Sequence, residues 1–388
     1  MKSWINRIRQ WLLPTQPLPP GVFHNQIFTP NQPNPHRLHL RIEADGTGLL
    51  VVDASTVLHL NQTAAEYAYH MLNNTPDEKA AREISKRYRV DFQQALDDYN
   101  ILRAQVESIT LTPDLDPETF LDMDRVDPFS KQLSAPYRLD CALTYRVPNG
   151  ARKEVAPSER VKRELLTEEW NLILDKAWQA GIPHVVFTGG EPTLRPDLPE
   201  IIAHAEKLGQ VTGLITDGSR LSEKDYLHQL LSAGLDHIML ILDMNEEQSW
   251  EALRDVLTED IFTTVHLTIT SSNIHQILEQ MDLLKQMGVT SISLTTTNPR
   301  LKPELESARE KATALEFHLV WDLPVPYSEL HPVALELADD PHLISGGGGA
   351  WLYVEPDGDV LPSQGVLEIF GNFLSDSWQT IWQRAQSR

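Results

Sequence analysis

Short apolar segments rich in β-branched residues recur through the second half of the chain, about 26 residues apart. Each gap between them holds one amphipathic helical pattern. Strands that alternate with helices in this way form a parallel sheet with right-handed crossovers, and functional residues lie on the loops that leave the strands' C-terminal ends. We therefore predict an α/β fold whose strands are residues 184–187, 211–216, 237–243, 264–270, 289–295 and 317–321.

The first helix of this series has the clearest boundaries. It is predicted to begin after Thr167, to carry Glu168 and Glu169 in its first turn, and to stop at Gly181. Apolar residues at helical spacing form its buried face, namely Trp170, Ile173, Leu174, Ala177 and Trp178.

Composition limits the classes of function. A chain of 388 residues is long enough for two or three packed units. The net charge of -22 disfavours a nucleic-acid groove, because such a groove needs many Lys and Arg residues. One cysteine, Cys141, allows neither a disulfide framework nor a cysteine metal cage within one chain.

The opening residues, 1–20, are predicted to form an amphipathic extension. Trp4, Ile5, Ile8, Trp11 and Leu12 share one helical face, opposite Lys2, Arg7 and Arg9. That pattern is compatible with an anionic membrane surface, but a helix packed on the protein body or a frayed terminus is the preferred explanation. No run reaches the roughly 18 apolar residues that span a bilayer, and the arginines interrupt any signal-peptide core. We expect a cytoplasmic protein.

Residues 21–110 are predicted to form a winged-helix-like α+β domain. Residues 38–55 read as a β-hairpin whose turn is Asp45-Gly46-Thr47-Gly48. Three helical patterns follow, at 62–72, 77–87 and 91–106. The proline-rich and acidic stretch 111–135 is predicted to be a linker.

The most specific motif follows the strand at 184–187 and reads Thr-Gly-Gly-Glu-Pro-Thr-Leu-Arg-Pro-Asp-Leu over 188–198. Two glycines at a strand end let a backbone approach a ligand closely. Glu191 supplies a carboxylate that could accept a hydrogen bond from a ligand ammonium group. The four letters Gly-Gly-Glu-Pro alone also suit an ordinary strand-to-helix turn.

The whole stretch, in its strand-loop-helix setting, resembles the radical S-adenosylmethionine (SAM) superfamily. The resemblance implies that residues 136–335 form a partial (β/α)6 TIM-type barrel. In that family this loop holds the methionine end of SAM, and the next strand ends in a Thr-Asn-Gly-like turn. The implied cofactor-binding residues here are Gly189, Gly190, Glu191, Pro192, Thr216, Asp217 and Gly218.

The family's iron-sulfur loop has the form Cys-x-x-x-Cys-x-x-Cys after the first strand, which residues 136–146 resemble. The matching positions here are Val147, Ala151 and Glu154. A 4Fe-4S cluster needs thiolate ligands, so we do not expect one at this loop. Cys141 falls within the predicted strand, where a small buried side chain is its expected role.

Residues 336–388 resemble the SPASM or twitch extension of the same family, with a β-hairpin formed by 351–354 and 360–361. Ser345 and Ser363 stand where relatives often place cysteines. The family's fourth strand often ends in Ser-Leu-Asp, and this chain has Ile241-Leu242-Asp243 instead. SAM is therefore a possible cofactor rather than a firmly expected one.

The first domain resembles the PqqD-type element of ribosomal peptide modification, including the turn at 60–65 into the first helix. Such elements bind a leader peptide as an added strand at an exposed β-ribbon edge. A winged helix that only docks on the barrel is the alternative.

Three functions stay open. The leading one is a degenerate radical SAM-like accessory factor that binds a precursor peptide or a partner enzyme, in ribosomal peptide modification or cofactor maturation. The second is a cluster-independent enzyme that uses SAM or another small molecule. The third is a working radical enzyme with unusual cluster ligands. His184, His237 and His266 lack a repeated ligand spacing, so we expect hydrogen-bonded core or rim histidines and no metal site.

Overall fold

The computed structural model describes residues 17–27, 35–54, 56–111, 133–148, 150, 152–321, 323–337 and 346–387. They divide into two compact units, and the boundary along the chain falls between Ser134 and Ala135. Four predictions lie wholly or mostly outside the described residues: the amphipathic opening, the linker and the positions of Ala151 and Ser345. No described helix has both the length and the apolar character needed to cross a membrane.

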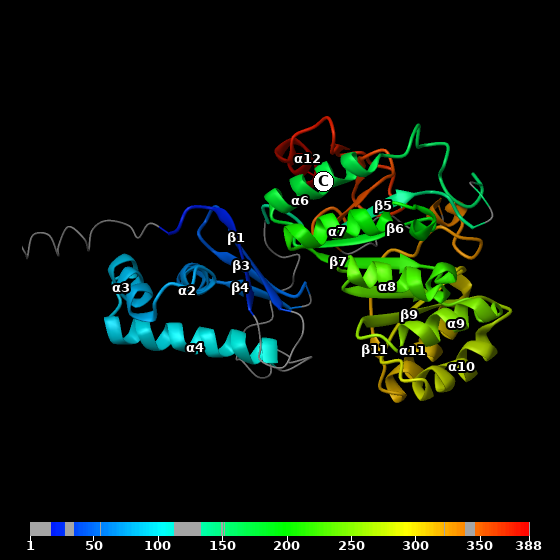
Figure 1. Cartoon of the computed structure of the whole chain (residues 1–388), viewed down its shortest axis with the longest axis horizontal. Coiled ribbons are helices and arrows are strands. Elements are labelled where there is room, and N and C mark those ends of the chain that lie inside the picture. Colours follow the sequence, from blue (N-terminus) through cyan, green and yellow to red (C-terminus); the bar gives the residue numbers. More distant parts are fainter. Residues whose placement is uncertain are drawn as a thin grey trace, which may run out of the picture. The chain divides into compact units, whose positions relative to one another are not determined.

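The first unit is a four-stranded antiparallel sheet in the order β1-β2-β3-β4 with three helices on one side (Figure 1). Its elements are β1 (Gly21–Ile27), β2 (His36–Ile42), β3 (Gly48–Val52), β4 (Thr56–Leu60), α2 (Gln62–Leu72), α3 (Asp77–Tyr88) and α4 (Phe92–Leu111). The predicted hairpin is β2–β3, and Gly46 in its turn has φ +83°. The hairpin's two outer edges pair with β1 and β4, which the sequence analysis did not identify.

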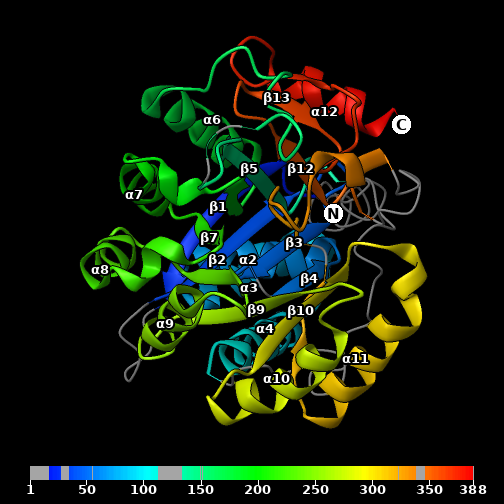
Figure 2. The ribbon, with the colours of Figure 1, turned by 90° about the vertical axis from the view of Figure 1, so that its right-hand side faces the viewer.

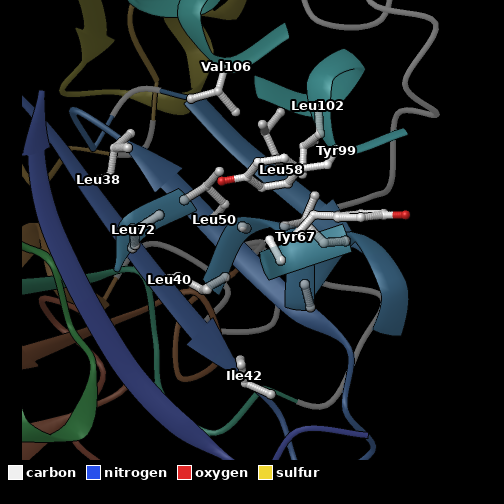
Figure 3. Packing of buried hydrophobic residues seen from close by; sticks show 14 of the residues in the cluster. Leu38, Leu40, Ile42, Leu50, Leu58, Tyr67, Leu72, Tyr99, Leu102 and Val106 are labelled. Carbon is white, nitrogen blue, oxygen red and sulfur yellow. The ribbon is translucent and has the colours of Figure 1, made fainter. Parts of the chain in front are cut away.

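The core of this unit lies between the sheet and the helices. Figure 3 shows Leu40, Leu50 and Leu58 from the strands facing Tyr67 and Tyr99 from the helices. Asn61 caps α2, because its side chain accepts a hydrogen bond from the N–H of Ala64 at 2.9 Å. The helices therefore begin and pack as their apolar periodicity predicts.

The second unit contains a ten-stranded sheet in the order β11-β10-β9-β8-β7-β6-β5-β12-β13-β14. Strands β5 to β11 are parallel to one another, and the helices surround them (Figure 2). These strands are β5 (Arg138–Thr144), β6 (His184–Gly189), β7 (Val211–Thr216), β8 (His237–Ile241), β9 (Phe262–Ile269), β10 (Ser291–Thr296) and β11 (His318–Leu319). The predicted α/β fold with an open partial barrel is confirmed, and each predicted strand overlaps an observed one.

Helices fill the gaps between these strands. They are α6 (Thr167–Ala180), η1 (Pro192–Leu194), α7 (Leu198–Leu208), η2 (Ser219–Ser222), α8 (Lys224–Ser232), α9 (Glu247–Val256), α10 (Ile274–Gln286), η3 (Pro299–Leu301) and α11 (Lys302–Ala314). Helix α6 stops at Gly181 as predicted. It begins one residue earlier than predicted, because Leu166 rather than Thr167 is the N-cap, and Trp178 is half-buried rather than buried.

The C-terminal residues continue the same sheet. The elements are η4 (Val333–Leu337), β12 (Trp351–Val354), β13 (Asp359–Leu361), β14 (Gly371–Asn372) and α12 (Trp378–Gln386). Strands β12 and β13 form the predicted antiparallel hairpin. Strand β12 also pairs in parallel with β5, so the hairpin extends the barrel sheet beyond its first strand.

Candidate functional site

The two glycines of the Gly-Gly-Glu-Pro loop bring the end of β6 against the end of β5. Gly189 has φ +130°, and a Cβ atom there would lie 2.2 Å from the Thr144 carbonyl oxygen. A Cβ atom on Gly190 would lie 2.2 Å from the Arg146 carbonyl oxygen. The N–H groups of Gly190 and Glu191 donate to these same two oxygens, both at 2.8 Å. Close approach by the protein's own backbone therefore requires both glycines.

The Glu191 carboxylate joins the ends of β6 and β7. Only 2% of Glu191 is exposed. Its Oε1 accepts hydrogen bonds from the Thr193 N–H at 3.0 Å, the Thr193 hydroxyl at 2.5 Å and the Thr216 hydroxyl at 2.7 Å. Its Oε2 accepts from the Asp217 N–H at 2.8 Å. Four protein donors thus already occupy a carboxylate that the sequence suggested for a ligand ammonium group.

Burial has the largest effect on the pKa of Glu191. Burial, and then the nearby Asp217 carboxylate, raise this pKa to about 8. The hydrogen bonds from Thr193, Asp217 and Thr216 act in the opposite direction and lower it. Glu191 therefore holds the loop together at a considerable desolvation cost, and its contacts require it to act as an acceptor.

The other predicted cofactor-binding residues gather at the same place. Pro192 begins η1, directly after Glu191. Gly218 has φ +78°, and its N–H donates to the Thr216 hydroxyl at 3.1 Å. The Asp217 carboxylate accepts a hydrogen bond from the Ser219 N–H at 2.8 Å. The structure thus brings the seven predicted residues together at the ends of β6 and β7, while their role toward a ligand stays a prediction.

Thr188 is a candidate that the sequence analysis did not single out. It lies at the end of β6, directly before Gly189, and only 1% of it is exposed. Among the residues that the structure describes, none forms a hydrogen bond with its hydroxyl. A buried hydroxyl without a partner is costly, so a ligand atom that paired with it would bind favourably. Thr188 is therefore added to the candidate ligand-binding residues.

The two described positions that match the family's iron-sulfur loop differ in their exposure to solvent. Val147 is buried, with 6% exposed, and has no donor atom, whereas Glu154 is exposed to solvent. Cys141 is fully buried within β5, and burial raises the pKa of its thiol well above the ordinary value, which disfavours the thiolate. Among the described residues, no three His, Cys, Asp or Glu side chains group as a metal site. These residues do not fit a 4Fe-4S cluster.

An apolar cluster lies beside this loop. Its buried members are Ala142, Tyr145, Ala156, Tyr327, Tyr353 and Leu361, and the Tyr145 and Tyr327 rings meet edge to face at 5.3 Å. The Tyr145 hydroxyl donates to Glu355 Oε1 at 2.8 Å, and the Leu165 N–H donates to the Pro356 carbonyl at 2.8 Å. The loop is therefore tied at both ends to the turn of the C-terminal hairpin.

All three histidines on the strands are hydrogen-bonded: His266 is a buried core residue, and His184 and His237 are half-buried at the first residues of β6 and β8. The Nε2 atoms of His184 and His237 lie 2.8 Å apart. His266 contacts the hydroxyls of Ser293 and Thr295, both at 3.1 Å. Burial lowers the pKa of His237 to about 4 and that of His266 to about 3, so these rings are neutral at pH 7.

An open parallel barrel, with a Gly-Gly-Glu-Pro loop after its second strand and a Thr-Asp-Gly turn after its third, resembles the arrangement expected of the radical SAM superfamily. Residues 141–270 match the family model described as "Radical SAM superfamily". This match supports the superfamily for the barrel unit.

Similar proteins include peptide-modifying ones. A "PqqA peptide cyclase" of Streptomyces rochei is 29% identical over 288 residues, which cover 66% of this chain and 78% of that protein. SuiB of Streptococcus suis has a similar fold. The structure of SuiB bound to the precursor peptide SuiA gives a TM-score of 0.57 at 15% identity and covers 88% of this chain and 86% of SuiB. The structure of SuiB bound to S-adenosylmethionine gives 0.58 at 16% identity, with 89% and 86% covered.

Proposed function

We propose that this protein binds a precursor peptide, or a partner modification enzyme, as a cytoplasmic accessory factor in ribosomal peptide modification or cofactor maturation. Its barrel keeps the radical SAM fold but does not assemble a 4Fe-4S cluster. The observation that carries this proposal is the loop after β5, where Val147 is buried and Glu154 is exposed.

The chemistry of the loop supports a barrel without a cluster. A 4Fe-4S cluster is normally held by several cysteine thiolates, and this chain has one cysteine. That cysteine, Cys141, lies within β5 and has no exposed surface.

The first unit supports peptide binding through its sheet edges. The predicted β2–β3 ribbon has no open edge, because β1 and β4 pair with it on either side. The outer edges of β1 and β4 are therefore the places where an extended peptide could add as a further strand. Main-chain hydrogen bonds would give affinity there, and side chains pointing to alternate faces would give selectivity.

The comparisons agree with a peptide partner in general. SuiB, whose fold is similar over most of this chain, has been crystallised with a precursor peptide, and another relative carries the name of a peptide cyclase. We extend from these proteins only the class of partner, a ribosomally made precursor peptide.

Binding can be tested on the full chain with precursor peptides encoded next to its gene. Fluorescence anisotropy of a labelled peptide would give the affinity, and hydrogen exchange would locate the contact. We expect slower amide exchange in β1 or β4 when the peptide is added, and no change with a scrambled peptide of the same composition. Absence of binding, or protection confined to the barrel unit, would count against the proposal.

A second candidate is a SAM-binding or small-molecule-binding enzyme that works without a cluster. The unpaired Thr188 hydroxyl beside Gly189 favours it. SAM would present an ammonium group and a carboxylate to this loop. The Thr188 hydroxyl could form a hydrogen bond with one polar atom of SAM. Thr188→Val keeps the shape and removes the hydroxyl, so SAM affinity should fall roughly 5- to 10-fold without loss of stability. Equal SAM affinity in both proteins would remove this candidate.

A further inference from the structure

The segment Leu323–Val333, here called the strap, links the carboxyl ends of several barrel strands. The Tyr327 N–H donates to the Gly189 carbonyl at the end of β6, at 2.9 Å. The Nε2 atom of His331 lies 2.7 Å from the Thr268 hydroxyl near the end of β9. The Val333 N–H donates to the Val155 carbonyl, at 2.8 Å, in the loop after β5. The strap thus reaches strands from both halves of the parallel sheet.

Apolar contacts hold the strap as well. Leu323 packs against a small cluster on β6, β7 and β8, formed by Val186, Ile215 and Met239. Tyr327, which is 3% exposed, packs edge to face against Tyr145. Burial of these side chains stabilises the closed position through the hydrophobic effect.

Two prolines restrict the backbone of the strap to few conformations. Pro324 and Pro326 restrict φ and carry no N–H group, so little conformational entropy is lost when this part is ordered. Val325 and Tyr327 alternate with these prolines and keep their N–H groups. The Tyr327 N–H is the group that donates to the Gly189 carbonyl. The Val325 carbonyl accepts from the Gln364 side chain at 2.8 Å, which fixes the strap to the segment after β13.

The contact with Gly189 has a consequence for ligand binding. The Gly189 carbonyl belongs to the loop that holds the methionine end of SAM in the resembling family, and an ammonium group would be a donor to such an oxygen. In this chain a donor from the strap, the Tyr327 N–H, already occupies that carbonyl. The unpaired Thr188 hydroxyl lies directly before it.

We propose that the strap is a built-in lid that competes with small-molecule donors for the Gly-Gly-Glu-Pro loop. A ligand with an ammonium group reaches the loop only when the strap leaves Gly189. The inference concerns access to the barrel, so it goes beyond the proposed peptide binding by the first unit and does not depend on it. The lid makes the apparent ligand affinity proportional to the fraction of molecules in which the strap is open.

This proportionality gives a quantitative test. His331→Ala removes the contact with Thr268, and Leu323→Ala removes the apolar contact with β6 to β8. His318→Ala is the matched control, because His318 lies on the short strand β11 and is exposed. Hydrogen exchange of the strap would measure opening, and equilibrium dialysis with radiolabelled SAM as the probe would measure affinity.

We expect slow exchange of the strap in the parent protein, and exchange roughly 5- to 10-fold faster in His331→Ala. In the double variant, which combines His331→Ala with Leu323→Ala, the strap should exchange faster still. SAM affinity should rise by the same factor as the exchange rate, and His318→Ala should change neither. Fast strap exchange in the parent protein, or faster exchange in the variants without any gain in SAM affinity, would overturn the lid. Peptide binding and iron content are separate measurements, so these outcomes do not affect the proposed function.

Discussion

Replacing Glu191 with alanine would remove the acceptor that joins the ends of β6 and β7. The N–H groups of Thr193 and Asp217 would lose their partner inside the protein, and each buried orphan donor costs about 1 to 3 kcal/mol. The hydroxyls of Thr193 and Thr216 can turn toward other acceptors. Relief of the carboxylate's own desolvation, which is visible in its pKa of about 8, offsets part of the loss. We expect a net loss of about 2 to 3 kcal/mol in the free energy of unfolding.

Chemical denaturation followed by tryptophan fluorescence would measure this loss. Seven of the nine tryptophans, all except Trp4 and Trp11, lie after residue 135, so the signal reports mainly on the barrel unit. Thermal unfolding should shift by roughly 5 to 10 °C for a unit of this size. Glu200→Ala is a suitable control, because Glu200 is an exposed acid at the start of α7 and its loss should cost less than about 0.5 kcal/mol. A Glu191→Ala protein as stable as that control would refute the structural role assigned to Glu191.

Three further predictions concern stability. Burial lowers the pKa of His266 to about 3 and of His331 to about 4, below their unfolded value near 6.5, so both favour the neutral form on folding. Their contribution is complete above pH 6.5 and is lost as pH falls toward 4. The stability lost between pH 7 and pH 5 should therefore be roughly 3 to 4 kcal/mol larger in the parent protein than in a double variant with His266→Gln and His331→Gln, and the comparison cancels the effects of His237 and Glu191; equal losses in both proteins would contradict this. Gly190→Ala places a Cβ atom 2.2 Å from the Arg146 carbonyl, so we expect a drop of more than about 2 kcal/mol by denaturation, whereas unchanged stability would mean that the loop can move apart. Asn61→Ala removes the cap of α2 and should lower the stability of the first unit by about 1 kcal/mol, measured by hydrogen exchange of that helix; unchanged exchange would exclude a capping role.

The barrel could be predicted from sequence because its strands and helices alternate with clear periods. Helix α6 illustrates this, since its apolar face and Gly181 fix its length to within one residue. Helix α4 extends to Leu111, five residues beyond the predicted end at Val106, because Ile109 continues its buried face. Strand β1 was not predicted, because Asn25 and Gln26 interrupt its apolar pattern. It is held in the sheet by its pairing with β2.

Long-range pairings could not be predicted, since they leave little local mark on the sequence. The parallel pairing of β12 with β5 joins Trp351 to Arg138 across more than half of the chain. The contact of the strap with Gly189 is of the same kind. The motif at 188–198 singled out residues that gather at the ends of β6 and β7, and their role toward a ligand stays a prediction. It did not show that protein groups satisfy the Glu191 carboxylate. That finding required the positions of Thr216 and Asp217.

The iron and acid-labile sulfide content of the protein after anaerobic reconstitution tests the central claim most directly. The account predicts negligible amounts of both, because Val147 and Glu154 cannot replace thiolates and Cys141 is buried within β5. About four iron atoms and four sulfides per chain would mean that a 4Fe-4S cluster assembles. That result would contradict the account and favour the third function, a working radical enzyme with unusual cluster ligands.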